Sequence, residues 1–384
     1  MKLMDRTIYI VIASVLCWCI LLLPINPSVS KALASESLVQ SEAYVVIDSN
    51  SGKVLSSKNK LKEMYPASIT KIVTAIMTIE SIDINEKTTV SNHAVHADGT
   101  RVYLLEDEEI TIDQLLHGLM VSSGNDAGIA IAEHVSGSVE NFALDMNQFL
   151  REEVGVENTS LSNPHGLFDE RHVTTALDMA RISAYAMKNA KFRELVNTES
   201  YNWVGEGWET TLYNHHPLLR GNEEVIGIKN GFVTESGYTL ATAAIQEDTE
   251  VIVVTLNSPT KDILVDDTLT LLNEAFSKYE TKWLSFADKE TLPGYIYPDS
   301  LPVTVVKGEK ILTGISETGV VSVYGAGKRL IDKIQLNQRQ EVRLPIDYLN
   351  IDKDVAISPK PERSESSFMS WLVVTGFLYF PLDK

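Results

Sequence analysis

The order of strand-like and helix-like segments constrains the fold of this 384-residue chain more than any other feature. Apolar stretches flank the turn sequence Asp48-Ser49-Asn50-Ser51-Gly52 within Ala43–Leu55, which is typical of a β-hairpin. A mostly helical block follows, and a further helix is expected over Asp262–Phe276. Between these lie three β-branched runs that indicate an antiparallel meander: Val225–Val233, Tyr238–Ile245 and Glu250–Leu256. We therefore expect one α+β domain, about residues 38–280, in which the early hairpin completes the late sheet.

The region from about residue 283 to residue 357 has a different pattern, in which short alternating runs are punctuated by Pro and Gly. Such runs are typical of a small all-β module. The expected strands are Val303–Val306, Val320–Val323, Leu330–Ile334 and Glu341–Leu344. The region contains no catalytic constellation, and its composition leaves three roles open: a binding module, a spacer that holds the first domain away from a membrane, or a stabilising appendage.

The N-terminus has the three parts of a secretory signal peptide. Basic residues precede the apolar run Ile8–Leu23, and a string of small residues follows it. We expect a signal peptide over residues 1–34 that is cleaved after Ala34; the alternative is an uncleaved membrane anchor. Both cysteines, Cys17 and Cys19, lie in the apolar run, so neither a disulfide framework nor a cysteine-based metal site is expected in the folded part.

The C-terminus combines a polar linker, residues 358–367, with an apolar segment, residues 368–384. Its nearly continuous apolar part, Phe368–Phe380, would rise about 20 Å as a helix. That length is short of the roughly 30 Å hydrocarbon core of a membrane, so we expect the segment to lie in the membrane interface. The alternative is a terminal strand or helix that packs on the folded body.

The formal net charge of -19, from 33 basic and 52 acidic residues, argues against a nucleic-acid partner, because binding to phosphates needs a surplus of Lys and Arg. Hydrophobic residues make up 44% of the chain and charged residues 22%, close to the averages of soluble globular proteins. A wholly disordered or polytopic membrane chain is therefore not expected.

Ser68 and Lys71 lie three residues apart at the start of Ile69–Ile79, a segment that is apolar almost all round and is expected to form a buried helix. This spacing places both side chains on one face. A desolvated lysine has a lowered pKa, and a neutral amine beside a serine hydroxyl can accept the proton that makes the serine a nucleophile. The alternative is a helix-capping serine followed one turn later by an exposed lysine.

Ser123 and Asn125 form a Ser-x-Asn triplet. Thr111–Gln114 has the pattern of a capping box that starts a helix, and Ser122–Asp126 interrupts before another helical run, so the triplet is expected on a tight loop between two helices. There Ser123 can relay a proton between Lys71 and a leaving amine, and the Asn125 amide can hold a peptide carbonyl. The alternative is an ordinary turn that connects two helices.

Lys229, Asn230, Gly231 and Phe232 lie in the first strand of the expected meander. Glycine beside a strand lysine lets the backbone pass close to a ligand. Lys229 and Asn230 can therefore bind a carboxylate, and the backbone N–H of Phe232 can join that of Ser68 in an oxyanion hole. The alternative is a β-turn, since Asn-Gly is the favoured hairpin dipeptide.

The remaining candidates for a metal site are two pairs of closely spaced histidines: His93 with His96, and His215 with His216. No H-E-x-x-H pattern accompanies them, so surface or turn positions are expected, with no metal and no cofactor.

In their order and spacing, the Ser-x-x-Lys, Ser-x-Asn and Lys-x-Gly motifs resemble those of the penicillin-recognising serine enzymes. From about residue 40 to the C-terminus the chain is similar to the low-molecular-mass penicillin-binding proteins that are serine-type D-alanyl-D-alanine carboxypeptidases. The similar segments are Pro66–Lys71, Ser122–Ala127, Asn163–Leu167 and Thr175–Ala180. The resemblance implies a β-lactamase/transpeptidase-like catalytic domain, in which helices pack on an antiparallel sheet, followed by a small all-β domain and a membrane-associated tail.

The resemblance also implies a role for each motif residue. Ser68 corresponds to the nucleophile and Lys71 to its base. Ser123 and Asn125 correspond to the proton relay and the substrate-holding amide, and Lys229 to the partner of the substrate carboxylate.

Two positions depart from the family pattern. The third motif usually reads Lys-Thr-Gly, and Asn230 replaces the threonine. Many members carry an arginine shortly after the last strand, whereas the only basic residue between Asn257 and Asp267 is Lys261, a point charge rather than a fork of donors. The hypothesis is that acylation survives, whereas recognition of free D-Ala-D-Ala termini is weakened or altered.

The resemblance implies an enzyme that cleaves the terminal D-alanine from peptidoglycan stem peptides through an acyl-enzyme on Ser68. It implies β-lactams as covalent inhibitors and a location on the extracytoplasmic face of the bacterial cell membrane. The alternatives are a catalytically impaired wall- or penicillin-binding protein, suggested by Asn230, and a β-lactamase of the same fold.

Overall fold

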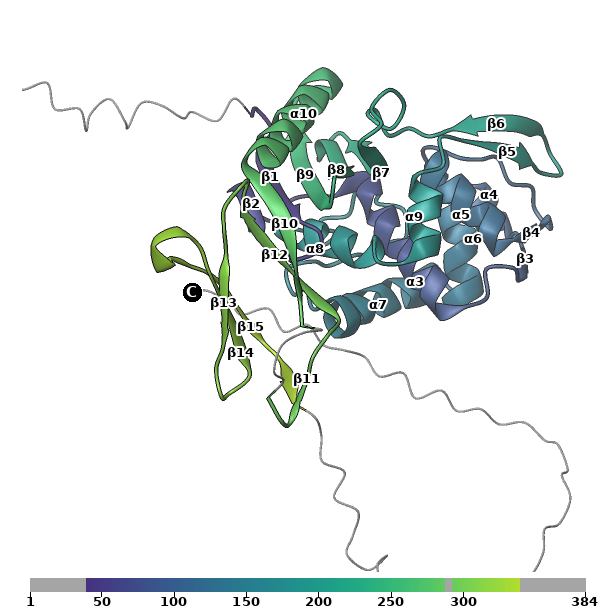
Figure 1. Cartoon of the computed structure of the whole chain (residues 1–384). Coiled ribbons are helices and arrows are strands. Elements are labelled where there is room, and N and C mark those ends of the chain that lie inside the picture. Colours follow the sequence, from purple (N-terminus) through teal and green to yellow (C-terminus); the bar gives the residue numbers. More distant parts are fainter. Residues whose placement is uncertain (1–38, 287–291, 339–384) are drawn as a thin grey trace, which may run out of the picture. The chain divides into compact units, whose positions relative to one another are not determined.

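The computed structural model of the chain describes residues 39–286 and 292–338 (Figure 1). The expected signal peptide, the polar linker, the apolar tail and the expected strand Glu341–Leu344 lie outside the described residues. So does the boundary of the β module at residue 357, and the proposed division into domains stays a prediction.

A five-stranded antiparallel sheet forms the centre of the fold, with the order β2-β1-β9-β8-β7. The strands are β1 Ala43–Asp48, β2 Val54–Lys58, β7 Val225–Val233, β8 Gly237–Gln246 and β9 Thr249–Ser258. The early hairpin pairs with the late meander through β1 and β9, which run antiparallel with Ala43 opposite Leu256. The prediction of an α+β fold is therefore confirmed, and β7 lies at the edge of the sheet.

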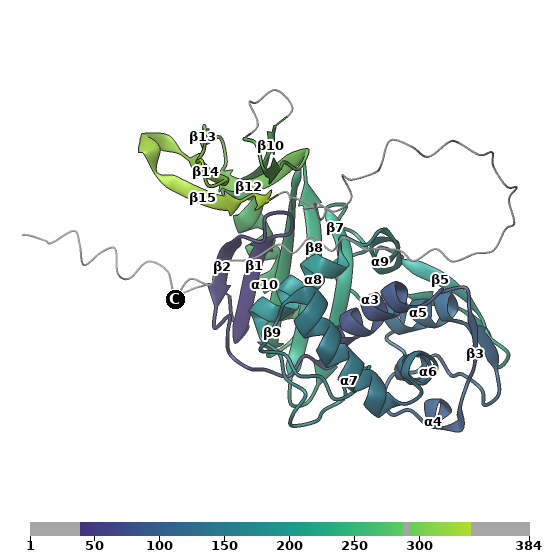
Figure 2. The same ribbon diagram turned by 90° about the horizontal axis from the view of Figure 1, so that it is seen from below.

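Helices cover both faces of this sheet (Figure 1). A short 3-10 helix, η1, Ala67–Thr70, leads into α3, and a π-helical turn, η2, Leu150–Val154, continues α7. The α-helices are α3 Lys71–Ser81, α4 Asn92–Val95, α5 Ile112–Val121, α6 Asn125–Ser136, α7 Val139–Phe149, α8 Ala176–Ala186, α9 Ala190–Val196 and α10 Lys261–Lys278. Figure 2 shows α3, α5, α6 and α7 side by side, and α3 contacts each of the other three.

The side chains of strand β1 pack into two different apolar cores, one on each face of the sheet. Ala43, Val45 and Ile47 belong to the large core beneath α3, α5 and α8, whereas Tyr44 and Val46 pack with α10 on the opposite face. Alternate residues of a strand point to opposite faces, so a continuous apolar run is what a sheet covered on both faces requires. The sheet is consequently rigid on both sides, which holds its edge strand β7 in place.

Two small hairpins interrupt the region that we expected to be mostly helical. Strand β3 Lys87–Thr89 pairs with β4 Glu109–Thr111, and β5 Ser200–Val204 pairs with β6 Glu209–Tyr213. These strands are short and largely polar, with one buried residue in each of β5 and β6, so their sequences carry little periodicity. The expectation of a mostly helical block was incomplete for this reason.

We call the strands from β10 onward the β module. Strand β10 Tyr279–Ser285 pairs with β12 Ser300–Val306, and β13 Leu312–Ile315, β14 Val320–Tyr324 and β15 Leu330–Gln335 form a second sheet. A third pair joins β11 Tyr295–Ile296 to β16 Asn337–Gln338. Alternating residues of these strands form a separate apolar core. The prediction of a small strand-rich region after the α+β domain is confirmed, although its first strand begins at Tyr279, before the expected boundary.

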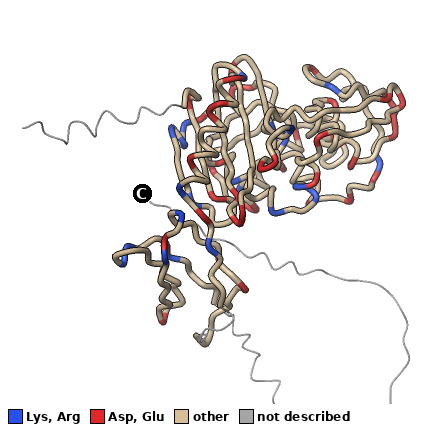
Figure 3. The backbone as a smooth tube through the Cα atoms, turned by 45° about the horizontal axis from the view of Figure 1, so that its top comes forward, with Lys and Arg blue, Asp and Glu red and all other residues tan. Residues whose placement is uncertain are grey.

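Acidic residues outnumber basic ones along the fold. Figure 3 shows Asp and Glu interspersed with Lys and Arg throughout the described part of the chain. Within residues 39–286 and 292–338, no helix combines the length and the apolar character needed to cross a membrane.

Candidate active site

Ser68 lies at a strained point of the backbone. It follows Ala67, whose φ of 51° is in the left-handed region that residues other than glycine rarely adopt. Ala67 and Ile69 are buried, whereas Ser68 is half-buried. The turn of η1 therefore leaves the Ser68 hydroxyl accessible while its neighbours anchor it, which is the geometry that a nucleophile needs.

Lys71, the first residue of α3, is completely buried. Its Nζ atom lies 3.0 Å from Ser68 Oγ, 2.7 Å from Asn125 Oδ1 and 2.8 Å from the His165 carbonyl oxygen. All three neighbours are uncharged oxygen atoms. A neutral amine has two N–H donors and one lone pair, so Lys71 can donate to Asn125 and His165 while it accepts the hydroxyl proton of Ser68.

The charge state of Lys71 follows from its surroundings. Burial lowers the pKa of Lys71 well below its usual value, and the positive charge of Lys229 lowers it further, against the opposing effect of Asp126. The expected neutral amine next to a serine hydroxyl is therefore what the environment favours. The exposed lysine of the alternative interpretation is excluded, because Lys71 has no exposed surface.

The loop Asn163–Leu167 fixes the Lys71 amine from the opposite side. Asn163 Oδ1 accepts from the Gly166 backbone N–H at 2.7 Å, and Asn163 Nδ2 donates to the Leu167 carbonyl at 2.9 Å. Gly166 has a φ of 87°, and a Cβ atom there would lie 1.9 Å from the Ala67 carbonyl oxygen. Only glycine lets this loop lie against η1. The backbone carbonyl of His165, rather than its ring, contacts the lysine.

Ser123 lies in the expected loop after the end of α5 at Val121, whereas Asn125 is the first residue of α6. Ser123 is buried and has a φ of 62°, a second strained position. Asn125 uses Oδ1 to accept from Lys71 and Nδ2 to donate to the Asp98 carbonyl at 2.7 Å. One N–H of the Asn125 amide therefore remains for a substrate carbonyl, and its expected role stays a prediction.

Asp126 is a residue whose role the sequence did not reveal. Its carboxylate accepts from the backbone N–H groups of Val102 at 3.0 Å and Leu104 at 3.3 Å, and so ties the loop before α5 to the start of α6. Burial raises the pKa of Asp126, and the backbone hydrogen bonds oppose that rise. The only sequence signal was its position directly after Asn125 in the Ser-x-Asn segment.

Strand β7 lies against η1, which brings the third motif to the nucleophile. A Cβ atom on Gly231 would lie 2.6 Å from the Ser68 backbone nitrogen, so the two backbones are in direct contact. Thr239 on β8, opposite Gly231, donates to the Pro66 carbonyl at 2.9 Å and so ties β8 to the start of η1. The β-turn interpretation of Lys229–Gly231 is wrong, because these residues pair with β8 inside a continuous strand.

Lys229 is buried, and burial lowers its pKa to about 7. Its Nζ atom donates to the Asn230 carbonyl at 3.1 Å and to Asn230 Oδ1 at 3.2 Å. Phe232 is 52% exposed and packs its ring on that of Tyr238, with centroids 4.6 Å apart. Its proposed backbone contribution to an oxyanion hole stays a prediction. Through its two hydrogen bonds with Asn230, Lys229 contacts the residue that replaces the usual threonine of the third motif. The family resemblance assigns Lys229 to carboxylate binding.

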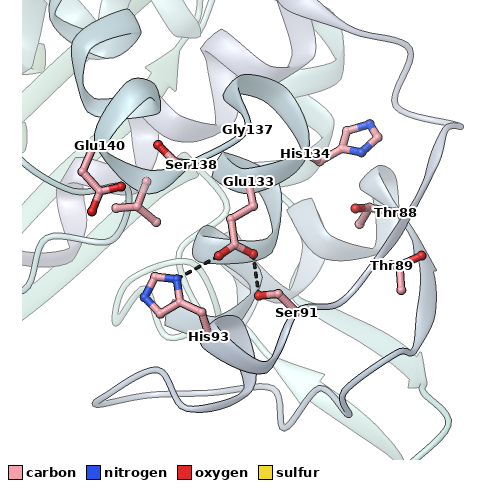
Figure 4. Close-up of a pocket in the computed structure, with 10 residues that line it drawn as sticks. Thr88, Thr89, Ser91, His93, Glu133, His134, Gly137, Ser138 and Glu140 are labelled. Atoms are coloured by element: carbon pink, nitrogen blue, oxygen red, sulfur yellow. Dashed lines mark hydrogen bonds and ion pairs between the residues drawn. The ribbon is translucent and has the colours of Figure 1, made fainter.

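A cavity of about 660 Å³ on α6 and α7 lies apart from these motifs, as none of their residues lines it. In Figure 4 the side chains of Ser91 and His93 converge on Glu133. Ser91 Oγ and His93 Nδ1 occupy one carboxylate oxygen each, at 2.6 and 2.8 Å, and Ser91 also caps α4. This arrangement fixes α4 on α6 and is structural. Among the residues that the structure describes, no group of three or more metal-ligating side chains is found.

Comparison with known proteins places this site in a family. The family model described as D-alanyl-D-alanine carboxypeptidase, peptidase family S11, matches residues 30–260. The chain is 34% identical over 253 residues to D-alanyl-D-alanine carboxypeptidase DacF of Bacillus subtilis, a match that covers 64% of this chain and 65% of DacF. It is 30% identical over 283 residues to D-alanyl-D-alanine carboxypeptidase DacA of Haemophilus influenzae, with 67% of each chain covered.

A solved structure, penicillin binding protein 5 from Haemophilus influenzae, has the same fold, with a TM-score of 0.69 and 26% identity over 79% of this chain and 98% of that chain. The chain thus belongs to the D-alanyl-D-alanine carboxypeptidase family S11, and the expected β-lactamase/transpeptidase-like fold is confirmed. The matched regions span about two thirds of the length of the curated relatives.

Proposed function

We propose that this chain is a serine-type D-alanyl-D-alanine carboxypeptidase that removes the terminal D-alanine from peptidoglycan stem peptides. The observation that carries the proposal is the buried Lys71 amine, placed 3.0 Å from Ser68 Oγ and surrounded by uncharged oxygen atoms. Family membership and the convergence of the Lys71 and Lys229 motifs support the same conclusion.

In the acylation step, Ser68 Oγ attacks the carbonyl carbon of the penultimate D-alanine as its proton passes to the neutral Lys71 amine. The developing oxyanion accepts hydrogen bonds from backbone N–H groups, for which we propose Ser68 and Phe232. The carbon–nitrogen bond then breaks, and the proton held by Lys71 passes through Ser123 to the leaving amine of D-alanine. An ester on Ser68 remains.

In the deacylation step, water attacks the ester carbonyl, and Lys71 accepts a proton from the water. The ester bond breaks, Ser68 Oγ takes the proton back, and the shortened peptide leaves. These steps use the side chains of Ser68, Lys71 and Ser123; for Asn125 we propose contact with a substrate amide, and for Lys229 contact with the substrate carboxylate.

Location follows from the substrate. Peptidoglycan lies outside the cytoplasmic membrane, so we place the enzyme on the extracytoplasmic face of the bacterial cell membrane. The proposed signal peptide, residues 1–34, would export the chain, and the apolar segment 368–384 would associate with the membrane interface. β-Lactams, which present a reactive acyl group to the same serine, are the proposed covalent inhibitors.

The test is to incubate the full chain with fluorescent penicillin and, separately, with a wall pentapeptide that ends in D-Ala-D-Ala. We expect a label that Ser68→Ala abolishes, and release of free D-alanine from the peptide by the wild-type chain alone. A stable label without D-alanine release would establish instead the impaired penicillin-binding protein that Asn230 suggested. Rapid turnover of the label would indicate a β-lactamase, and no label at all would refute the acyl-enzyme on Ser68.

A further inference from the structure

The side-chain amide of Asn125 has two orientations of nearly the same shape, and only one of them suits acylation. Its Oδ1 atom accepts from Lys71 Nζ at 2.7 Å, and its Nδ2 atom donates to the Asp98 carbonyl at 2.7 Å. Turning the amide over would exchange these two atoms, because an amide has an acceptor at one end and donors at the other. The flipped amide would donate to the lone pair of Lys71, which is needed for the proton of Ser68.

Lys71 itself cannot select the orientation. A neutral amine both donates and accepts, so it forms a hydrogen bond with either end of the Asn125 amide. A backbone carbonyl only accepts, and the Asp98 carbonyl therefore bonds only to Nδ2. The orientation of Asn125 is consequently decided by the backbone of the segment that carries Asp98.

We call residues 98–104, between α4 and β4, the orienting loop. Asp98 and Thr100 are exposed, so burial of their side chains does not anchor this part of the loop. The Thr100 carbonyl instead accepts from the backbone N–H of Asn125 at 2.7 Å. Asn125 therefore contacts the loop twice, once through its backbone and once through its side chain.

Asp126 holds the rest of the orienting loop on α6. It is buried, and its carboxylate accepts from the backbone N–H groups of Val102 at 3.0 Å and Leu104 at 3.3 Å. Hydrogen bonds to an ionised acceptor are stronger than those between neutral groups. Asp126 also lies in the first turn of α6, where the helix dipole favours a negative charge. The exposed end of the loop is thus attached to a firm anchor.

Gly99 lets the Asp98 carbonyl reach the amide. Its φ of 80° is in the left-handed region, and a Cβ atom at this position would lie 2.8 Å from Asn125 Nδ2. Asn125 is buried and both ends of its amide are bonded, so the side chain has little room to give way. Any larger residue at position 99 would therefore separate the carbonyl from the amide.

We propose that Asp126 and Gly99 are positioning residues, which act through the orienting loop to fix one orientation of the Asn125 amide. The lone pair of Lys71 then stays free for the Ser68 proton, and one N–H of the amide remains for a substrate carbonyl. The proposal rests on the proposed function for the acylation step, in which Lys71 is the base. The orientation itself is a property of the resting chain and can be measured without turnover.

The first experiment measures the rate at which fluorescent penicillin acylates Gly99→Ala. We expect a loss of about 10- to 100-fold, the range for a buried polar group that loses its hydrogen-bond partner. The matched control is Gly155→Ala, because Gly155 also has a left-handed φ, 75°, but a Cβ atom there would meet nothing within 4 Å. Gly155→Ala should react at the wild-type rate. Circular dichroism and a thermal melt establish that each variant folds, and a wild-type rate in Gly99→Ala would overturn the role of Gly99.

A double-mutant cycle separates positioning from a general structural effect. In an Asn125→Ala chain, Gly99→Ala should cause less than about a twofold further loss, because the contact that it disturbs is already missing. Losses that multiply would show that Gly99 does not act through Asn125, and would overturn the proposal.

Asp126→Asn keeps the volume of the side chain and removes the charge that the orienting loop is bonded to. We expect acylation to slow by about 3- to 10-fold, since hydrogen bonds to a neutral acceptor are weaker. The lost charge by itself would lower the pKa of Lys71 further and keep its amine neutral. A slower rate at neutral pH would therefore report the position of Asn125, whereas a rate at or above that of wild type would overturn the role of Asp126.

Hydrogen exchange of the Asn125 side-chain amide, followed by NMR and assigned with Asn125→Ala, tests the proposal without any turnover. A hydrogen-bonded amide exchanges slowly, so we expect slow exchange in wild type and Gly155→Ala, and faster exchange in Gly99→Ala and Asp126→Asn. That result would support the proposal even if the wild-type chain released no D-alanine from a wall pentapeptide, which would refute the peptidase activity alone. Equal exchange in all of these chains would overturn the proposal.

Discussion

The α+β body buries charge, whereas the described part of the β module does not. Lys71, Asp126 and Lys229 are all buried in the body. In the β module up to residue 338, the buried side chains are apolar apart from Thr281 and Thr304. Burying an ionisable group costs free energy unless it is neutralised or paired.

Several carboxylates are buried elsewhere in the body, but its two buried lysines, Lys71 and Lys229, both belong to the motifs of the candidate site, where Ala67 and Ser123 also have strained backbone. A rigid sheet covered on both faces maintains the costly arrangement, and the lowered pKa of each lysine is its direct result. The β module follows the ordinary rule that strands alternate buried apolar and exposed polar residues. The difference between the two regions that bears on chemistry is therefore the pair of buried lysines, which only the body contains among the described residues.

The largest expected effect comes from replacing Lys71 by methionine, which fills a similar volume without an amine. Acylation by fluorescent penicillin should slow by about 100-fold to 10,000-fold, the contribution of a positioned general base. The free energy of unfolding in urea should rise or stay equal, because a buried ionisable group is removed. Labelling at the wild-type rate would show that Lys71 is not the base, and Lys188→Met, just after α8, serves as the control that keeps full labelling.

A second, smaller effect concerns pH. The pKa of Lys229 is about 7 in the folded chain, against 10.5 for an ordinary lysine, so the unfolded chain binds one more proton between these values. Stability should therefore rise with pH from about 7 toward 10, by up to about 1.4 kcal/mol per pH unit from this residue. Lys229→Met should be more stable than wild type near neutral pH, with a difference that shrinks as the pH rises.

Urea unfolding of wild type and Lys229→Met at several pH values measures this difference and cancels the titration of other groups. A difference that is constant with pH would mean that Lys229 keeps an ordinary pKa in the folded chain. The same variant should also release D-alanine more slowly from a wall pentapeptide that ends in D-Ala-D-Ala, because Lys229 is the proposed partner of the substrate carboxylate.

The smallest effect on activity is expected in the β module. Thr281 and Thr304 lie opposite each other on β10 and β12, and both donate to Asp48 Oδ2, at 2.6 and 2.7 Å. Thr304→Val should lower the free energy of unfolding by about 1–2 kcal/mol, because the hydroxyl loses its hydrogen bonds with Asp48 and with Ser51 Oγ, 2.6 Å away. D-Alanine release should be unchanged, since none of these contacts involves the candidate site. The exposed Thr318→Val is the stability control, and a loss of activity in Thr304→Val would show that the β module takes part in catalysis.

Much of the fold was readable from residue patterns. Continuous β-branched runs at residues 225–256 predicted the meander, and the capping threonine at position 111 predicted the start of α5, where Thr111 Oγ1 accepts from the Gln114 backbone N–H at 3.2 Å. The Gln114 side chain, however, donates to the Val204 carbonyl at 2.7 Å rather than back to the cap. Local patterns predicted the start of α5. They did not predict that the Gln114 side chain would bond to β5, about 90 residues away, instead of to the helix cap.

The candidate site was only partly readable. Spacing placed Ser68 and Lys71 on one face, because a helical turn is a local property of the chain. The contacts of Lys71 with the His165 carbonyl, and of Asp126 with the loop at Val102, join segments far apart in sequence. Neither hydrophobic periodicity nor residue propensity predicts a hydrogen bond to a distant backbone group, whether it is the carbonyl that Lys71 contacts or the N–H that Asp126 contacts, so these partners were not predictable.

The amino-acid sequence by itself determined the strands of the central sheet, most of the helices and the order of the three motifs, because these depend on neighbours a few residues apart. Tertiary structure alone decided the charge of Lys71 and Lys229, since desolvation requires a complete core around each amine. Secondary structure and motif order depend on residues close together in the chain. The shifted pKa values depend on distant segments that pack together and exclude water.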